Sequence, residues 1–221
     1  MGYCSRREAE KLIEQRVVKV NGVPAKITTA VNPNSDIVEI KNKKLEEKKK
    51  AVYIMLNKPA GVISTCNAGR EKGRIVLNYV KIPERIYPVG RLDRDSTGLL
   101  LLTNDGELAY KLTHPSRSNE KEYLVEFDAP LTDRQVQLFL SGISLNGKKA
   151  KALQVNRQSR RKYSIILNQG LNRQIRRMAE AAGRSIVKLK RVRMGTLRLG
   201  RLSEGSWRYL TDNEINRLRQ S

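Results

Sequence analysis

The first fifteen residues carry apolar side chains at helical spacing. The spacing of Ala9, Leu12 and Ile13 would place these three apolar side chains on one face of a helix. Ser5 and Glu8 have the three-residue spacing of a capping box, which marks a helix start. We therefore predict a helix over residues 5–15.

A different period follows, in which apolar and polar residues alternate as they do in strands. The predicted strands are 17–20, 23–27 and 36–40. Asn21-Gly22 separates the first two and predicts a tight hairpin turn. The run 41–50 then carries ten residues of which only Leu45 is apolar, which is typical of a charged linker. We therefore predict a first domain at 1–42, a linker at 43–51 and a second domain at 52–221.

The second domain combines apolar strands with amphipathic helices. The predicted strands are 52–56, 98–103, 123–127 and 163–167, and the segment 57–61 is predicted as a turn. The predicted helices are 107–112, 132–140, 172–182 and 212–219. Asn172 is a candidate cap for the third helix and Gly183 a candidate end. Because strands and helices do not alternate regularly, the pattern favours an α+β fold with a mostly antiparallel sheet.

Charge narrows the possible partners of this fold. The 221 residues contain 44 Lys and Arg against 22 Asp and Glu, a net charge of +22. Residues 151–221 hold 18 of the basic side chains and 4 of the acidic ones, within segments that also have apolar periodicity. A folded basic surface of this kind indicates a polyanion, and we expect a nucleic acid. Plain solubility needs a net charge of only about 2–8.

Several other functional classes are disfavoured. No apolar run reaches the ~18 residues of a membrane span, and the first residues lack the apolar core of a signal peptide. Cys4 and Cys66 form no CxxC pair, and one His leaves little scope for a zinc site or a Ser-His-Asp triad. We expect a cytoplasmic protein that binds no membrane and needs no metal.

The segment Gly90 to Gly98 is the first candidate for chemistry. It sets two carboxylates, Asp93 and Asp95, among two arginines on a loop that leads into a buried strand. A neighbouring arginine favours the ionised carboxylate, which can then act as nucleophile or base. The same composition also fits a salt-bridged loop with a turn hydrogen bond from Asp95 or Ser96.

Three further segments carry basic or aromatic side chains. In 170–178 a helix would place Arg173 and Arg177 on one face with Arg176 offset from it, suited to phosphate or to a solvated face. Residues 188–193 alternate as a strand with one charged face. Tyr123, after Lys121-Glu122, stands at a strand start, where it can stack on a base or pack in the core.

Taken in order, these motifs resemble the RsuA-like family of bacterial rRNA pseudouridine synthases, which join an S4 RNA-binding domain to a catalytic domain. Residues 5–40 are similar to an S4 domain, although only four residues precede Ser5 where such domains usually have a further helix. We therefore expect this S4-like domain to be incomplete at its N-terminal end. The motifs of the catalytic domain are Asn57-Lys58-Pro59-Ala60-Gly61, Gly90-Arg91-Leu92-Asp93 with Ser96-Thr97-Gly98-Leu99, Lys121-Glu122-Tyr123 and Gly170 to Met178. The wording of the last motif is most similar to the F-type members, which modify large-subunit rRNA.

The resemblance implies roles for individual residues. Asp93 matches the catalytic aspartate, Arg176 the arginine that pairs with it, and Tyr123 the active-site tyrosine. Arg91 would fill the space left by the flipped base, and Leu189 would line the uracil pocket. The remaining residues expected to bind RNA are Arg6, Arg7, Arg173, Arg177, Lys190 and Arg191.

The implied reaction breaks the N1–C1′ bond of a uridine and rejoins the base through C5, so it needs no cofactor. We expect a monomer that acts on a loop or stem-loop uridine of 23S rRNA, where base flipping is least costly. The alternatives are the same chemistry on 16S rRNA or tRNA, and a non-catalytic S4-type RNA-binding or ribosome-associated factor.

Overall fold

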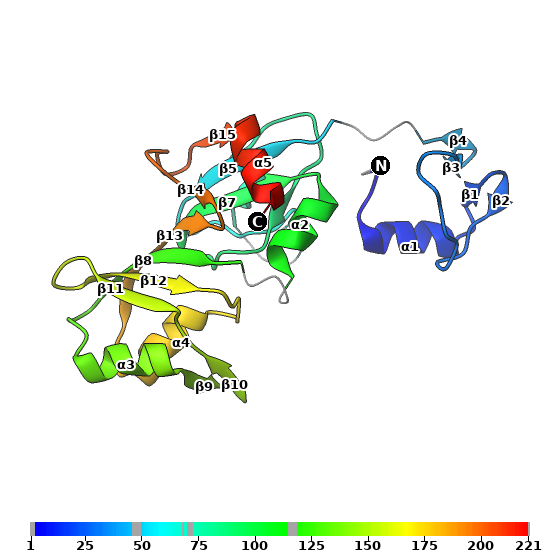
Figure 1. Cartoon of the computed structure of the whole chain (residues 1–221). Helices are drawn as coiled ribbons and strands as arrows, with labels where there is room; N and C mark the ends of the chain where they lie inside the picture. Colours follow the sequence, from blue (N-terminus) through cyan, green and yellow to red (C-terminus); the bar gives the residue numbers. More distant parts are fainter. Residues whose placement is uncertain (1–2, 46–49, 68, 70–72, 115–118, 221) are drawn as a thin grey trace. The chain divides into compact units, whose positions relative to one another are not determined.

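The computed structural model describes residues 3–45, 50–67, 69, 73–114 and 119–220. The chain divides into two compact units, Met1–Lys50 and Ala51–Ser221 (Figure 1). Residues 46–49 of the predicted linker lie outside the described residues. In the described part of the chain, no helix is long and apolar enough to cross a membrane.

The N-terminal unit is one helix and a small antiparallel sheet of order β2-β1-β3-β4. Its elements are α1 (Arg6–Glu14), β1 (Val18–Val20), β2 (Val23–Pro24), β3 (Val38–Ile40) and β4 (Lys43–Lys44). The predicted capping box is present, because the Ser5 side chain accepts from the Glu8 amide and Glu8 binds the Ser5 amide in return.

The predicted linker begins too early. Lys43 and Lys44 form β4, because Lys41 and Asn42 both adopt positive φ, at 51° and 62°, and turn the chain back onto β3. Leu45 then packs against the core of this unit, in which Val18, Ala25 and Ile40 are buried. The apolar residue within the charged run therefore belongs to the N-terminal unit.

The second unit is built on one large mixed sheet. Its strands are β5 (Tyr53–Lys58), β6 (Tyr87–Val89), β7 (Thr97–Thr103), β8 (Lys121–Phe127), β9 (Ile143–Leu145), β10 (Lys148–Ala150), β11 (Gln154–Arg157), β12 (Lys162–Leu167), β13 (Ile186–Met194), β14 (Leu197–Arg198) and β15 (Trp207–Tyr209). The helices are α2 (Gly106–Thr113), α3 (Asp133–Ser141), α4 (Gln174–Ala181) and α5 (Asp212–Gln220), with a 3-10 turn at Val76–Asn78.

The strand order is β11-β12-β8-β13-β7-β5-β15, with β14 beside β13 and β6 beside β7. Only the β13–β7 pair is parallel among these strands. The predicted α+β class with a mostly antiparallel sheet is thereby confirmed. The β9–β10 hairpin forms a separate two-stranded sheet.

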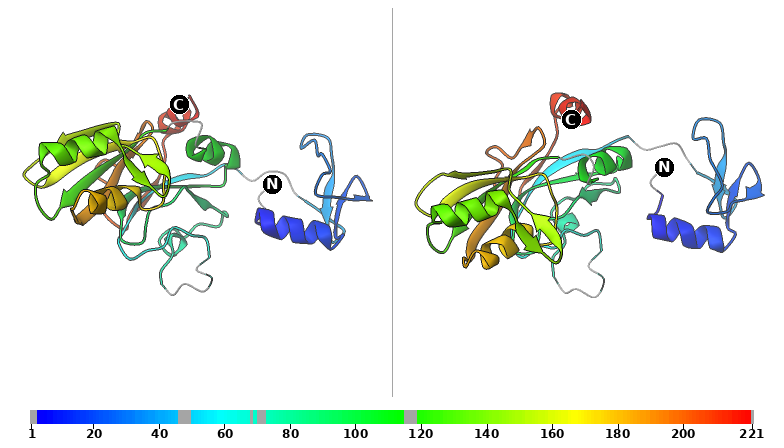
Figure 2. Two further views of the ribbon diagram at one scale, coloured as in Figure 1. Left: turned by 90° about the horizontal axis from the view of Figure 1, so that it is seen from below. Right: turned by 60° about the horizontal axis from the view of Figure 1, so that its bottom comes forward.

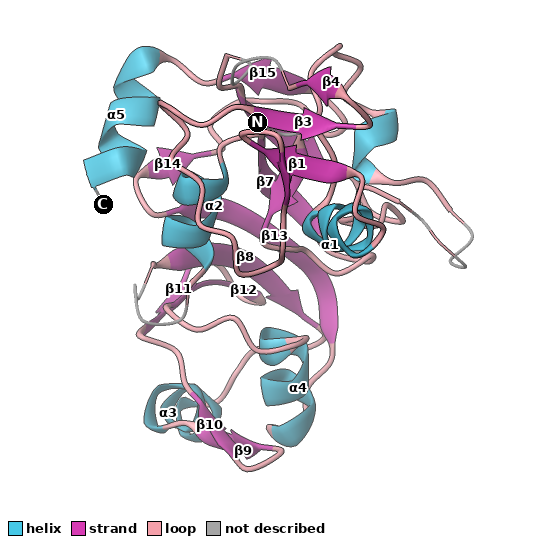
Figure 3. Ribbon diagram, turned by 90° about the vertical axis from the view of Figure 1, so that its right-hand side faces the viewer, coloured by secondary structure: helices cyan, strands magenta, loops and turns pink. Residues whose placement is uncertain are grey.

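The half of the sheet around β5 and β7 is buried on both faces. Leu99 to Leu102 are fully buried, and alternate residues face two different apolar clusters. One cluster receives α2 and α5, which lie near each other in Figure 3 and are joined by a hydrogen bond from Lys111 to the Arg219 carbonyl. This double coverage explains why β7 reads as an uninterrupted apolar run.

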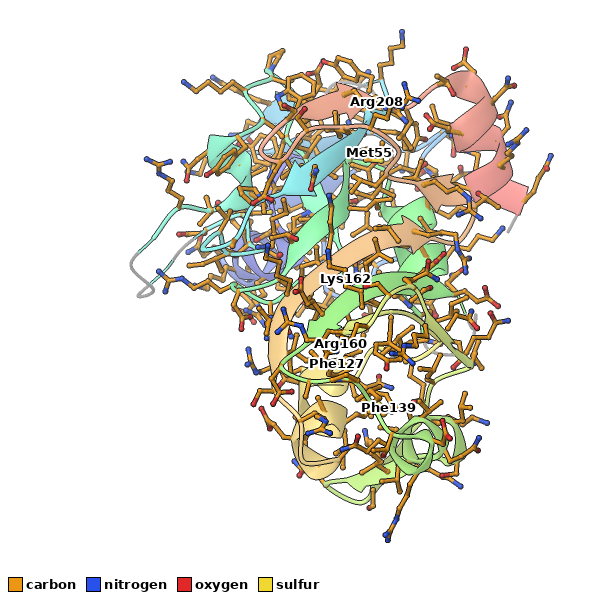
Figure 4. The ribbon with its side chains drawn as sticks, turned by 90° about the vertical axis from the view of Figure 1, so that its left-hand side faces the viewer. Met55, Phe127, Phe139, Arg160, Lys162 and Arg208 are labelled. Carbon is orange, nitrogen blue, oxygen red and sulfur yellow. The ribbon has the colours of Figure 1, made fainter. Side chains whose placement is uncertain are left out.

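The other half packs α3 and α4 against β8 and β12. Figure 2 shows the two helices beside each other, and the Gln135 side chain on α3 donates to the Ala182 carbonyl at the end of α4 at 2.7 Å. Phe127 and Phe139 meet edge to face in this core, with ring centroids 6.0 Å apart (Figure 4). The two halves thus have separate cores joined by one sheet.

Two local predictions need correction, and several short strands were not predicted. Asn57 and Lys58 continue β5 instead of starting a turn, because both are buried against neighbouring strands. Asn172 is not the cap of α4, since that position is taken by Arg173. The strands β9–β11, β14 and β15 are absent from the prediction, because segments of two to four residues are too short to show a recognisable alternation. Gly183 does follow the end of α4, at a φ of 70°.

Candidate active site

The loop that carries Asp93 connects β6 to β7 and is held on both sides of that residue. Before it, Leu92 forms two hydrogen bonds with the buried Ser64 side chain, its amide donating at 3.1 Å and its carbonyl accepting at 2.8 Å. After it, the Arg94 carbonyl accepts from the Gly61 amide at 2.7 Å. The Ser96 amide closes the turn onto the Asp93 carbonyl at 3.1 Å. The backbone of Asp93 is therefore fixed by its neighbours.

Lys58 is the buried anchor of this loop. Its side chain is 0% exposed, and Nζ donates to the carbonyls of Pro59 (2.9 Å), Val62 (2.8 Å) and Arg94 (3.3 Å). Burial lowers the pKa of Lys58 to about 8, although the charges of Asp95 and Asp93 oppose that shift. One cation thus joins the end of β5 to the residue that follows Asp93.

Asp95 is the acceptor for two arginines of the 170–178 motif. Arg173 Nη1 lies 3.3 Å from its Oδ1, and Arg176 Nε lies 3.3 Å from its Oδ2. Arg176 Nη2 also donates to the Asp95 carbonyl at 3.3 Å and to the Ser96 hydroxyl at 3.4 Å. The expected pairing of Arg176 with Asp93 is therefore wrong in this structure, because the first turn of α4 meets the loop two residues further on.

The predicted shared face of Arg173 and Arg177 is also wrong. Arg173 has a left-handed backbone, with φ 48° and ψ 35°, and α4 begins only at Gln174. The four-residue spacing of a helix therefore does not apply to it. Arg177 points instead to the turn between β9 and β10, where it donates to Asn146 at 2.7 Å.

The Asp93 loop opens onto a cleft of about 1040 Å³, where the sheet's two halves meet. Predicted site residues that line it are Arg91, Asp93, Tyr123, Arg173, Leu189 and Arg191. Among the described residues, the Asp93 carboxylate has no hydrogen bond or ion pair. The volume of this cleft is slightly above the range of ordinary ligand pockets, about 300–1,000 Å³.

The other predicted RNA-binding residues are scattered. Arg191 is only 2% exposed, so it is not part of the predicted charged face of its strand. Lys190 belongs to the opposite face of β13 and does not line the cleft. Arg6 and Arg7 are exposed on α1 of the N-terminal unit.

Two families match this chain. Residues 52–181 match RNA pseudouridylate synthases, and residues 1–37 match the S4 domain. The dual-specificity RNA pseudouridine synthase RluF of Shigella flexneri is 43% identical over 216 residues, which are 97% of this chain and 73% of that protein. The chain belongs to the RNA pseudouridylate synthase family. The enzyme is also 43% identical to the ribosomal large subunit pseudouridine synthase B of Bacillus subtilis, over 99% of this chain and 91% of that one.

The fold of this synthase agrees with that assignment. A solved structure titled as a pseudouridylate synthase superimposes with a TM-score of 0.73 at 29% identity, covering 98% of this chain and 95% of the other. The predicted family and the predicted enzyme class, a pseudouridine synthase with an S4 domain, are therefore confirmed.

Sequence reasoning missed the supporting residues of the synthase site. Ser64 carries no motif of its own, and its role depends on a partner 28 residues away. Lys58 carried a weak signal, a lysine two residues after the apolar run 52–56 and directly before a proline. Lys121 belongs to the motif Lys121-Glu122-Tyr123, in which the sequence assigns a role to Tyr123 alone, but Lys121 also lines the cleft.

Proposed function

We propose that this synthase converts a uridine of 23S rRNA to pseudouridine, with Asp93 as the residue that acts on the ribose. The observation that carries the proposal is a carboxylate in the cleft that has no side-chain partner among the residues the structure describes, on a backbone held by Ser64, Gly61 and Arg176. A group that must approach a substrate has to be free of internal partners yet fixed in place. The target is supported by the name of the Bacillus subtilis relative, which refers to the large ribosomal subunit.

The reaction needs no atom beyond those of the substrate. The N1–C1′ bond breaks with its electron pair leaving on the uracil, and the uracil turns so that C5 faces C1′. The C1′–C5 bond then forms, C5 loses its proton and N1 gains one. Asp93 serves either by attacking C1′, to be displaced when C5 bonds, or by removing a ribose proton and returning it.

The other cleft residues suit substrate placement. Tyr123 is half-buried on β8 and packs against the cores of both halves of the sheet, so its ring is well supported for stacking on the flipped uracil. Leu189, buried on β13, would line the base pocket, and the exposed Arg91 would fill the gap left in the RNA. Flipping costs roughly a few kcal/mol. Arg176 would hold the Asp93 loop through Asp95 and Ser96.

The remaining predicted RNA contacts belong to cations that are exposed or half-buried. Arg6 and Arg7 on α1 would bind RNA through the S4-like unit, and Lys190 would contribute from the opposite face of β13. Arg173 and Arg177 already have partners in Asp95 and Asn146, and they would bind phosphate in addition to these contacts. Such contacts fix position without reading sequence.

Mapping pseudouridine in total RNA from cells with and without this gene tests the target. We expect one or a few 23S positions to lose the modification, and restoration by the wild-type gene but not by Asp93→Asn. This substitution nearly preserves volume, so RNA affinity should stay within a few fold. If Asp93→Asn protein retains a tenth of the wild-type rate, Asp93 is not the reacting residue.

The same mapping separates the alternatives. The Shigella flexneri relative is named as a dual-specificity RNA enzyme, so a second RNA class is a candidate, and the mapping covers 16S rRNA and tRNA. Loss of a tRNA or 16S position alone would move the target. Unchanged modification in all three, together with tight RNA binding, would identify a non-catalytic RNA-binding factor.

A further inference from the structure

Two cations line the cleft beside Tyr123, and of these Lys121 is half-buried and Arg191 is buried. Lys121 is the first residue of β8, and because side chains two residues apart share a strand face, it lies on the same face as Tyr123. Arg191 is paired in register with Tyr123 on the neighbouring strand β13 and is 2% exposed. Both residues line the cleft.

Neither cation has a carboxylate partner in the described part of the chain. Lys121 Nζ donates to the Asn119 carbonyl at 2.9 Å. Arg191 donates from Nε to the Leu99 carbonyl at 2.8 Å and from Nη1 to the Arg91 carbonyl at 3.4 Å. Its Nη2 is buried without a hydrogen-bond partner. Among the described residues, the hydrogen-bond acceptors of these two cations are therefore all neutral carbonyls.

Asp93 is the carboxylate that lines the cleft, and among the described residues it forms no ion pair with either cation. Asp95 is engaged by Arg173 and Arg176, and the charges of Asp93 and Asp95 act on Lys58. Burial and the nearby charge of Arg191 both lower the pKa of Lys121, and no carboxylate opposes that shift. Buried charges are unfavourable unless they are paired, so this position is complementary to an anion from outside the chain.

We propose that Lys121, backed by the charge of Arg191, binds one backbone phosphodiester of the RNA next to the nucleotide held in the cleft. This inference rests on the proposed function, since it takes RNA as the ligand. A phosphodiester carries its charge permanently, whereas the uracil becomes anionic only while its bond to C1′ is broken. Lys121 makes the contact, and Arg191 acts through the field it adds and the position it gives Tyr123.

Equilibrium binding of the full chain to a 23S stem-loop tests the charge requirement. Lys121→Gln should raise Kd about tenfold, the usual loss for a hydrogen bond to a charged group. It should also flatten the slope of log K against log salt by about 0.7, the value for one contact to single-stranded RNA. Lys121→Arg keeps the charge and should keep both the affinity and the slope. The matched control is Lys162→Gln, an exposed strand lysine outside the cleft (Figure 4), which should leave Kd within twofold.

A methylphosphonate scan of the loop linkages identifies the partner, because each replacement removes one phosphate charge. We expect one linkage whose neutralisation weakens wild-type binding as much as Lys121→Gln does, with no further loss when both changes are combined. Additive losses at every linkage would overturn the proposal. So would an unchanged Kd with slower turnover, which would assign the charge to the departing uracil.

The binding measurements do not require turnover, so they separate this inference from the proposed function. If the wild type forms no pseudouridine but the shared linkage effect is present, the function fails and the phosphate site stands. If pseudouridine forms and Lys121→Gln binds RNA like the wild type, the proposed function stands and the phosphate site fails.

Discussion

Arg176 reaches Asp95 rather than Asp93, with its Nε 3.3 Å from Asp95 Oδ2 and its Nη2 3.3 Å from the Asp95 carbonyl. One side chain thus holds both the carboxylate and the backbone of a residue two positions beyond the proposed reacting group. The Arg176 side chain is 11% exposed, whereas that of Asp95 is 49% exposed. The contact of Arg176 with the hydroxyl of Ser96, a residue that is 1% exposed, is therefore the better shielded part of the interaction.

This geometry predicts unequal effects for the two partners. Arg176→Lys loses the fork that reaches Asp95 and Ser96 together, so kcat should fall well beyond tenfold. Asp95→Asn keeps the backbone carbonyl as acceptor, and the fall should be about tenfold or less. Single-turnover rates on one RNA measure both, with Arg161→Lys, at the exposed pair with Glu126, as the control. Equal losses for the two variants would show that the carboxylate carries the interaction.

Gly98 and Arg191 predict a strong effect on stability. A Cβ at Gly98 would lie 2.2 Å from the Arg191 carbonyl oxygen and 2.7 Å from its amide nitrogen, and Gly98 has a φ of +105°. Gly98→Ala should therefore lower the free energy of unfolding by about 3 kcal/mol or more. Urea unfolding measures this, with Gly170→Ala as control, because nothing lies within 4 Å of a Cβ there. Equal stability of the two variants would contradict the close approach of β7 and β13.

Lys58 predicts a loss of activity at alkaline pH. Its pKa of about 8 means that its proton leaves as the pH rises through that value, which removes the charge and one donor from the carbonyls of the Asp93 loop. We expect kcat/KM to fall above pH 8. The pKa of Lys121 is lowered as well, so Lys121→Gln is the control variant, and its kcat/KM should fall in the same way. A flat profile up to pH 9.5 would contradict this role.

The contribution of Lys58 to the free energy of unfolding should become more favourable over the same rise in pH. The folded pKa of Lys58 lies below the value of about 10.4 for an unfolded chain, so the unfolded state binds more protons between these values. The unfavourable contribution of the buried charge should therefore fade as the pH rises from about 8. Unfolding curves at pH 7 and 9 separate lost activity from lost structure.

Glu214 predicts acid sensitivity of the C-terminal helix. Arg208 donates to both its carboxylate oxygens, at 2.6 and 2.8 Å, and holds the pKa of Glu214 at about 2. The folded pKa is below the unfolded one, so this stabilisation is complete above about 4.3 and is lost as the pH falls towards 2. Glu214→Gln should lower the free energy of unfolding by about 1–2 kcal/mol at pH 7, since Arg208 is partly exposed. The difference should shrink at pH 3 in urea titrations, and the exposed Glu180→Gln should have little effect at either pH.

The sequence by itself determined the local elements and the class of protein. The capping box at Ser5, the Asn21-Gly22 turn and the apolar run Leu99–Leu102 depend on neighbours within a few residues, and all three are present in the structure. The order of the motifs indicated the family for the same reason, because each motif is a short contiguous pattern. Asp93 could be singled out because it lies inside one of them.

Only the tertiary structure decided which side chains meet. Arg176 and Ser96 are 80 positions apart, Lys58 and Arg94 are 36 apart, and Arg191 donates to a carbonyl 92 positions away. Arg173 has a left-handed backbone, so it does not share the helix face that its spacing from Arg177 predicts. Lys58 ends a buried strand where the sequence predicts a turn. Burial is likewise a property of the whole sheet. The alternating pattern of residues 188–193 therefore predicts Arg191 as a surface charge, whereas in the fold it is buried and lines the cleft.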